Sequence, residues 1–122
     1  MIGYVTLGTN DLKRAAAFYD ALLGSVGAKR IMDFDTFIAW NSKPGAAGLC
    51  LTEPFDKNKA TVGNGVMVAL AAISKEQVDS LYTKAISLGA TDEGKPGPRG
   101  EGFYAAYFRD LDGNKLNCFF MG

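Results

Sequence analysis

The sequence is built from two halves that follow the same pattern. Residues in the second half match residues 63 positions earlier, and the matched pairs are Tyr4/Met67, Leu7/Leu70, Phe18/Leu81 and Tyr19/Tyr82. After one residue of slippage, Val-Gly-Ala at 26–28 matches Leu-Gly-Ala at 88–90. A repeat of this length indicates that one supersecondary unit occurs twice. We therefore expect the fold to contain two similar modules.

The first half has the pattern of a β-α-β-β-β unit. An alternating segment at 2–7 predicts a strand, and the following Thr-Asn-Asp offers side-chain oxygens that can cap a helix ending near Gly24. Three more strands are predicted at 28–33, 36–41 and 48–52, with turn residues between them. The segment that follows is polar and rich in Lys, Asn and Gly, which is typical of a connection.

The second half repeats these elements. A strand is predicted at 66–71, then a helix from the capping box Ser74-x-x-Gln77 to Gly89. Further strands are predicted at 90–93, 103–109 and 115–121. Asp110-Leu111-Asp112-Gly113 predicts a tight hairpin, because Asp-Gly suits positive φ angles. The Gly- and Pro-rich segment 95–102 is interpreted as a mobile loop, serving either as a lid over a ligand or as a plain connection.

Composition narrows the classes of function. The chain has 13 basic and 13 acidic side chains, and zero net charge argues against a nucleic-acid or membrane partner, because both need a basic excess. No leader-like N-terminus and no long apolar stretch are present, so we expect a cytoplasmic protein. Cys50 and Cys118 lie in apolar runs and are predicted to be buried, reduced thiols. The absence of histidine excludes His-based triads and His-containing zinc sites.

Four segments carry a resemblance to a known family, namely residues 2–12, 17–20, 65–70 and 109–117. In this order they resemble the vicinal-oxygen-chelate superfamily, which includes glyoxalase I, extradiol dioxygenases, fosfomycin-resistance enzymes and bleomycin-binding proteins. The resemblance covers essentially the whole chain. It implies an α+β fold of two β-α-β-β-β modules whose curved mixed sheets surround one shared cleft. We assign module 1 to residues 1–56 and module 2 to residues 65–122, joined by a linker at 57–64.

The resemblance also implies where a metal would bind in metal-bearing members. Carried over to this sequence, the two first-strand histidines are Tyr4 and Met67, and the last-strand glutamate is Asn117. A phenol with a pKa of about 10, a thioether and a neutral carboxamide do not suit a common divalent ion. We therefore expect no metal and no cofactor. Glu53 lies near a fourth ligand position, but overlaying Cys50 on Cys118 puts Leu49 there, so Glu53 is interpreted as a solvated strand end.

Strand alternation then sorts the side chains into two faces. The predicted ligand-binding cleft contains Tyr4, Thr6, Trp40, Met67, Ala69, Tyr107, Arg109, Asn117 and Phe119. Trp40 is either a wall of the cleft, part of a subunit interface or a core residue. Arg109 either holds a carboxylate or phosphate or pairs with Asp110 or solvent. The cleft itself is either a binding pocket or is filled by its own side chains as extra core.

These observations favour a metal-independent small-molecule binding protein of the glyoxalase/bleomycin-resistance type, which sequesters or senses an apolar or aromatic ligand. By analogy with the superfamily we expect a homodimer. One alternative is a glyoxalase-like lyase, isomerase or dioxygenase with an atypical active site that uses Tyr4, Glu53 or Arg109. Another is an interaction module whose cleft is closed. The fold alone does not decide among these classes.

Overall fold

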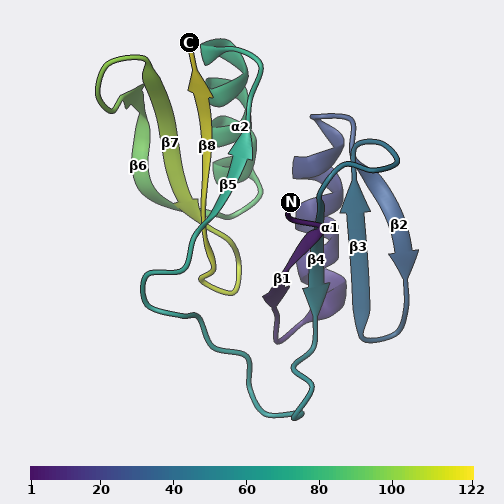
Figure 1. Cartoon of the computed structure of the whole chain (residues 1–122). Helices are drawn as coiled ribbons and strands as arrows, with labels where there is room; N and C mark the ends of the chain where they lie inside the picture. Colours follow the sequence, from purple (N-terminus) through teal and green to yellow (C-terminus); the bar gives the residue numbers. More distant parts are fainter. The chain divides into compact units, whose positions relative to one another are not determined.

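The computed structural model describes residues 1–122, and the chain divides into two compact units, Met1–Val62 and Gly63–Gly122. From here on, module 1 means the unit Met1–Val62 and module 2 means the unit Gly63–Gly122. Each contains one helix and one four-stranded mixed sheet (Figure 1). The predicted α+β class, with two β-α-β-β-β units, is confirmed.

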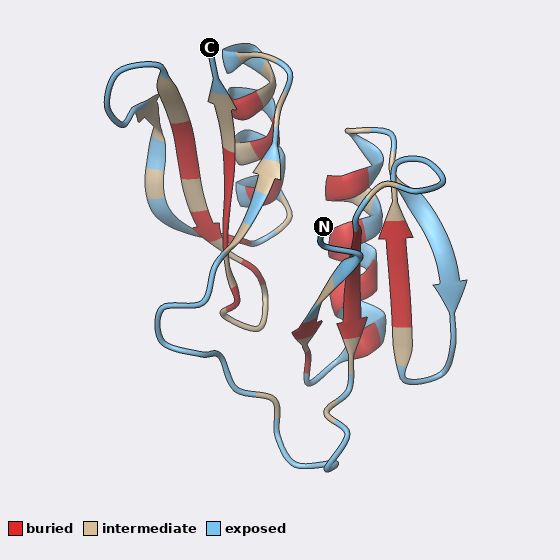
Figure 2. Cartoon of the chain, in the orientation of Figure 1, coloured by how far each residue is buried: buried red, intermediate tan, exposed pale blue.

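Module 1 contains five elements in chain order. They are β1 (Tyr4–Gly8), α1 (Leu12–Gly24), β2 (Lys29–Asp33), β3 (Phe37–Asn41) and β4 (Gly48–Thr52). The strand order in the sheet is β1-β4-β3-β2, with β1 parallel to β4 and the other neighbours antiparallel. β2 is an edge strand and is exposed along its whole length (Figure 2).

Module 2 repeats this arrangement. Its elements are β5 (Val68–Ala71), α2 (Lys75–Ser87), β6 (Thr91–Pro98), β7 (Phe103–Arg109) and β8 (Lys115–Met121). The strand order is β5-β8-β7-β6, again with one parallel pair, β5 with β8. The equivalent strands of the two modules are therefore β1 and β5, β4 and β8, β3 and β7, and β2 and β6.

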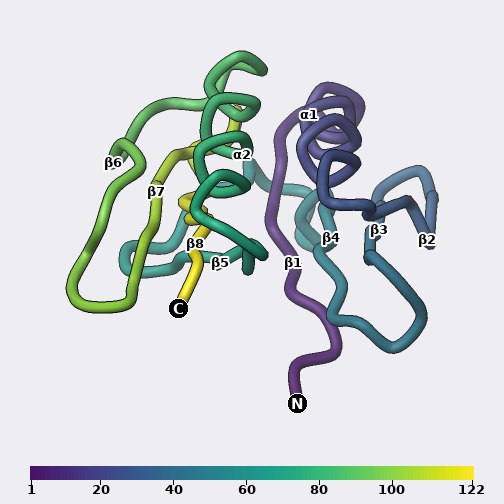
Figure 3. The backbone as a smooth tube through the Cα atoms, turned by 90° about the horizontal axis from the view of Figure 1, so that it is seen from above, coloured from purple at the N-terminus to yellow at the C-terminus, as the bar shows by residue number.

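Each helix covers one face of its own sheet (Figure 3). Helix α1 begins where the Asp11 carboxylate accepts a hydrogen bond from the Arg14 N–H at 3.1 Å, and α2 begins where Ser74 accepts from the Gln77 N–H at 3.1 Å. Both helices bury their apolar residues against the sheet (Figure 2). The other face of each sheet carries no helix of its module, and we call it the open face.

Several strand boundaries differ from the predicted ones, and two of the differences bear on the predicted loop and cleft. β6 extends from Thr91 to Pro98, so the predicted loop shrinks to the four residues that separate it from β7. The strand accommodates Pro96 and Pro98 because it is an edge strand with two register shifts, and prolines are tolerated at edges and bulges. In addition, β5 begins at Val68, so Met67 precedes the strand instead of lying in it.

The predicted hairpin between β7 and β8 is confirmed. The Asp110 carboxylate is buried and accepts hydrogen bonds from the N–H groups of Asp112 and Asn114, each at 2.9 Å. Gly113 has a φ angle of 88°, in the left-handed region that favours glycine. Neither α1 nor α2 is long and apolar enough to cross a membrane.

Candidate functional site

The open face of module 1 is identified by its strand pairing. Tyr4 pairs with Gly48, Thr6 with Cys50, and Ala39 with Cys50 on its other side, so these side chains point the same way. The alternate residues of the same strands face the helix. They include Leu7, Ile38, Trp40, Leu49 and Leu51, all of them buried.

An apolar cavity of about 290 Å³ lies on this open face. Its floor is formed by three small residues of the two central strands, Ala39, Gly48 and Cys50. Its walls are formed by larger side chains, namely Tyr4, Ile31, Met32 and Phe37. No charged residue lines it. We call this cavity the module 1 pocket.

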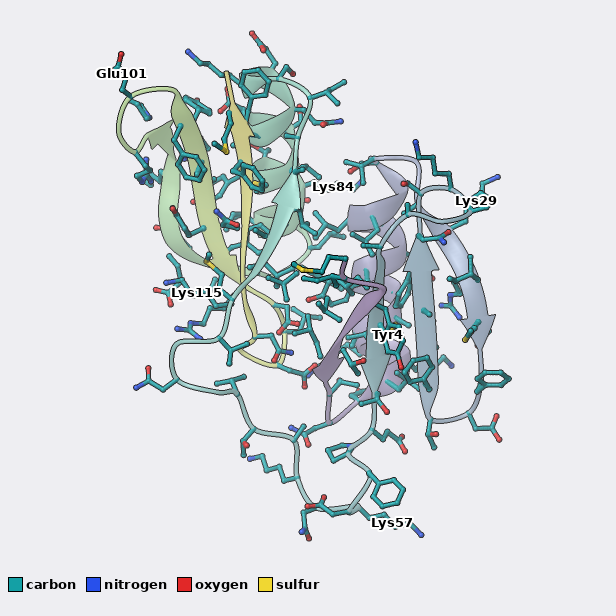
Figure 4. All side chains as sticks on the ribbon, viewed as in Figure 1. Tyr4, Lys29, Lys57, Lys84, Glu101 and Lys115 are labelled. Carbon is teal, nitrogen blue, oxygen red and sulfur yellow. The ribbon has the colours of Figure 1, made fainter.

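Tyr4 and Cys50 are the side chains of this pocket that carry polar atoms. Tyr4 is 65% exposed and lies on β1 (Figure 4). Cys50 is a free, buried thiol. Burial raises its pKa, and a hydrogen bond with the Thr6 hydroxyl partly opposes that shift. The pocket is therefore lined by a neutral thiol, a phenol and hydrocarbon.

Trp40 lies on the opposite, helix-facing side and is a core residue, so its prediction as a cleft wall is wrong. It is 1% exposed, and its indole N–H donates to the Asp20 carboxylate of α1 at 2.9 Å. Asp20 is also held by Arg30, which is the main cause of the lowered pKa of this carboxyl. Alternation decides the outcome, because Trp40 adjoins Ala39, which points into the pocket.

The open face of module 2 carries larger side chains along its central strands. Asn117 pairs with Ala69 on one side and with Tyr107 on the other, and Phe119 pairs with Ala105. Phe119 stacks against Phe103 with ring centroids 5.6 Å apart. Most of the predicted cleft residues of module 2 thus share one face, and they fill its centre instead of leaving a hollow.

Asn117 is the most unusual residue of this face. It is 2% exposed, and its Oδ1 atom has no hydrogen-bond partner. A buried acceptor without a partner costs about 1–3 kcal/mol, so such groups are uncommon in folded proteins. An unpaired amide oxygen is ready to accept a hydrogen bond from a ligand.

Positive charge gathers around Tyr107. The guanidinium of Arg99 and the ammonium of Lys115 lie 5.5 and 5.6 Å from the centroid of its ring. Arg109 is also on this face, but it pairs with Glu93 and donates to the Gly113 carbonyl at 2.9 Å. Of the alternatives left open for Arg109, pairing with Asp110 is not the one that occurs, because its carboxylate partner is Glu93.

The register corrects one predicted overlay of the two halves. Thr6 and Ala69 are 63 positions apart, and their partners in the neighbouring strand are Cys50 and Asn117. Cys50 is therefore equivalent to Asn117 and not to Cys118. By the same logic, Ala39 is equivalent to Tyr107, because each pairs with one of these two residues. Ala39 and Cys50 are 11 positions apart, whereas Tyr107 and Asn117 are 10 apart, so the hairpin of module 1 is one residue longer.

Sequence reasoning missed the other walls of the module 1 pocket. Ile31 and Met32 lie on β2 at a register shift, and Phe37 lies at the start of β3. The available signal was the exposure of large apolar residues on an edge strand, which becomes visible only when the sheet order is known. Glu53 is exposed just after β4, as expected for a solvated strand end.

The residues at the superfamily's metal-ligand positions do not fit a metal ion. The chain contains no cluster of three or more His, Cys, Asp or Glu side chains arranged to hold one. Cys50 binds a metal ion only as a thiolate, and burial raises its pKa, which makes the loss of its proton more costly. Asn117 offers only a neutral carboxamide.

Paired β-α-β-β-β modules with open sheet faces define a class of protein, and comparison with known proteins identifies it. The profile of the Glyoxalase/Bleomycin resistance protein/Dioxygenase superfamily matches residues 1–118. The chain belongs to this superfamily. No curated protein matches the chain.

Solved structures agree with this assignment. A glyoxalase/bleomycin resistance protein from Albidiferax ferrireducens is 37% identical with a TM-score of 0.89, and the match covers 98% of this chain and 97% of that chain. A hypothetical protein from S. aureus is 28% identical with a TM-score of 0.76, covering 98% and 92%. The fold is also shared with a lactoylglutathione lyase from Agrobacterium tumefaciens, which is 23% identical with a TM-score of 0.73 and coverage of 98% and 92%.

Proposed function

We propose that this protein binds an uncharged apolar or aromatic small molecule in the module 1 pocket, without a metal ion. The observation that carries the proposal is the pocket lining, which is apolar apart from one phenol and one neutral thiol. Small-molecule sites combine apolar area for affinity with a few polar groups for orientation. The 37% identical relative is named a glyoxalase/bleomycin resistance protein, which supports a ligand-binding role.

The lining favours a ligand portion without charge. A carboxylate or ammonium in this pocket would lose its water shell and find no ion of opposite sign. A hydroxyl, by contrast, can exchange a hydrogen bond with Tyr4, whose exposed side chain lies at the rim. Tyr4 is thus the orienting group in this proposal.

The size of the pocket favours two fused rings. Its volume of about 290 Å³ is roughly twice that of a cavity of about 150 Å³ known to accept benzene. A bicyclic aromatic with one hydroxyl, such as 2-naphthol, therefore has a suitable size and polarity. It serves as a probe of the pocket and stands for a class of ligand.

The test is binding of 2-naphthol by isothermal titration calorimetry, with the Ala39→Leu variant as the comparison. Ala39 is 3% exposed and lies on the pocket floor, so a leucine there occupies the space of the ligand. We expect saturable binding to the unmodified protein and a loss of affinity of at least about tenfold in the variant.

Ala17→Leu is the matched control, because it makes the same chemical change at an exposed position of α1. It should bind 2-naphthol as the unmodified protein does. Equal affinity in the Ala39 variant, or no binding to any of the three proteins, contradicts the proposed site. Elemental analysis of the purified protein examines the second part of the proposal, which one tightly held equivalent of a transition metal would contradict.

The proposal extends to the setting in which the protein works. We propose that it acts in the cytoplasm as a homodimer that sequesters or senses its ligand, by analogy with the superfamily. Analytical ultracentrifugation measures the oligomeric state. The observed structure supplies no feature that favours catalysis by Tyr4, Glu53 or Arg109 over binding.

A further inference from the structure

The Arg99 side chain lies folded back over the open face of module 2. Its Nη2 donates to the Lys95 carbonyl at 2.6 Å and its Nη1 donates to the Pro98 carbonyl at 3.4 Å. The guanidinium carbon lies 5.5 Å from the centroid of the Tyr107 ring. The cation is therefore held in place by two carbonyl groups and an aromatic face before any ligand arrives.

Two glycines of β6 make this position available. A Cβ atom at Gly94 would lie 3.3 Å from Nη2 of Arg99 and 3.0 Å from Cδ1 of Tyr107. A Cβ atom at Gly97 would lie 3.1 Å from Nη1 of the same arginine. These distances are shorter than ordinary carbon contacts, so larger residues would push the guanidinium away. Gly94 and Gly97 therefore leave the space that the Arg99 guanidinium occupies.

Lys115 brings a second positive charge to the same ring. Its ammonium lies 5.6 Å from the Tyr107 centroid, and its place at the start of β8 is marked in Figure 4. No carboxylate pairs with Arg99 or Lys115, whereas Arg109 beside them is paired with Glu93. Arginine has five N–H donors, and the two carbonyl bonds leave three of them free. The face thus holds two uncompensated cations with spare donors.

The unpaired amide of Asn117 lies next to this charge. Asn117 is the direct cross-strand partner of Tyr107, and cross-strand partners on one face have Cβ atoms about 4.5–5.5 Å apart. Its Oδ1 is buried and has no partner. Arg99 and Lys115 therefore supply the donors for an oxyanion beside this ring, whereas Asn117 Oδ1 is an acceptor and can bind only an N–H or O–H group elsewhere on the ligand.

We infer that the open face of module 2 binds the oxyanion of a small organic acid, between Arg99 and Lys115 beside Tyr107. An oxyanion accepts hydrogen bonds from the free N–H groups of the guanidinium. Its negative charge also offsets the repulsion between the positive charges of Arg99 and Lys115. The carbon skeleton of the acid lies against the apolar side chains of this face. One of them is Phe119, which follows Asn117 by two residues on β8. The inference goes beyond the proposed function, because it places an acidic ligand on module 2 and not in the module 1 pocket.

The experiment measures binding of benzoate, phenyl phosphate, inorganic phosphate and uncharged benzamide by calorimetry at low ionic strength. Lys115→Gln and Arg99→Gln each remove one cation. Lys75→Gln is the matched control, because the Lys75 ammonium also lies over a tyrosine ring, 5.8 Å from the centroid of Tyr104, whose hydroxyl bonds to α2 on the helix-facing side. We expect benzoate or phenyl phosphate to bind and each cation variant to lose about tenfold in affinity, as for one charged hydrogen bond.

We expect no binding of benzamide. The control variant Lys75→Gln should bind the acids as the unmodified protein does. Arg99→Gln can disturb β6, so its thermal unfolding is measured, and Lys115→Gln alone decides the matter if that variant is unfolded. Three results overturn the inference: no saturable binding of either organic acid, unchanged affinity in Lys115→Gln, or inorganic phosphate binding as tightly as both acids. If 2-naphthol binds but the acids do not, this inference fails and the proposed function stands; if the acids bind and 2-naphthol does not, the module 1 pocket is the part that fails.

Discussion

Ala39 in module 1 and Tyr107 in module 2 occupy equivalent positions, because each is the cross-strand partner of Cys50 or Asn117, which are themselves equivalent. In module 1 the small side chain leaves the centre of the open face hollow, and the cavity lies there. In module 2 the tyrosine fills the centre and carries two cations on its ring. The same strand order therefore supports a neutral hollow in one module and a charged, filled surface in the other.

The backbone arrangement therefore does not determine whether an open face is hollow or filled, or whether it is neutral or charged. Strand order and pairing type are the same in both sheets. What differs is the size of a few side chains on the two central strands, and the charge that Lys115 of β8 and Arg99, just after β6, bring to module 2. If the contrast holds, substitutions at these positions change the free energy of unfolding by different amounts in the two modules.

Replacing the filling residue of module 2 should have the largest effect. Tyr107→Ala removes a partly buried ring and leaves Arg99 and Lys115 without the aromatic face that they share. We expect a loss of about 2–3 kcal/mol in the free energy of unfolding, measured by urea denaturation. A loss below about 0.5 kcal/mol, the usual effect of a surface substitution, would mean that Tyr107 does not fill the centre of the open face of module 2.

The thiol of module 2 makes stability depend on pH. Cys118 is 0% exposed, and burial raises its pKa from 9.0 to about 11. The unfolded chain therefore releases this proton first as pH rises, so stability is complete below about pH 9 and is lost between about pH 9 and pH 11. We expect Cys118 to contribute a loss on the order of 2 kcal/mol across that interval. Urea denaturation at a series of pH values measures it.

Cys118→Ala serves as the control for that pH dependence. It lowers stability at every pH because it removes a buried sulfur, but the fall between pH 9 and pH 11 should become shallower. A slope as steep as in the unmodified protein would assign the pH dependence to other groups, such as Tyr82 and Tyr104, whose pKa values are also raised.

Removing the unpaired amide of module 2 should stabilise the protein. Asn117→Leu replaces a buried acceptor without a partner by a hydrocarbon of similar volume, which we expect to add about 1 kcal/mol to the free energy of unfolding. Differential scanning calorimetry measures the rise in Tm. A drop in Tm would show that the amide already has a partner in the folded protein.

Filling the hollow of module 1 should change stability least. Ala39→Tyr places in module 1 the residue that module 2 carries at the equivalent position, and the cavity has room for the ring. We expect a change of less than about 1 kcal/mol in urea denaturation, together with loss of 2-naphthol binding. Destabilisation by several kcal/mol would mean that the pocket is closed in the folded protein.

Much of the fold follows from local sequence. The capping residues, the apolar spacing of both helices and the Asp-Gly hairpin agree with the structure, because each depends on residues within a few positions of one another. The extent of β6 could not be predicted, since Gly94, Pro96 and Gly97 disfavour a strand locally. Their strand is formed by pairing with β7, which local propensity does not record.

The candidate site was predictable only in part. Alternation along single strands places Tyr4, Thr6, Asn117 and Phe119 on the open faces. It does not place Trp40, because the choice between core and open face depends on how β3 pairs with β4. Nor does it reveal Ile31 and Met32 as pocket walls, because both lie at a register shift on an edge strand.

Local sequence patterns were enough to predict two β-α-β-β-β units, and the absence of histidine is read directly from the sequence. That Tyr4, Met67 and Asn117 stand at the positions of the superfamily's metal ligands is an expectation carried by the resemblance. The match of Cys50 with Asn117, the match of Ala39 with Tyr107 and the place of Arg99 over the Tyr107 ring emerged only from strand pairing and side-chain contacts. Repeats and caps are local patterns, whereas a pocket or a charged surface depends on which strands become neighbours and in what register.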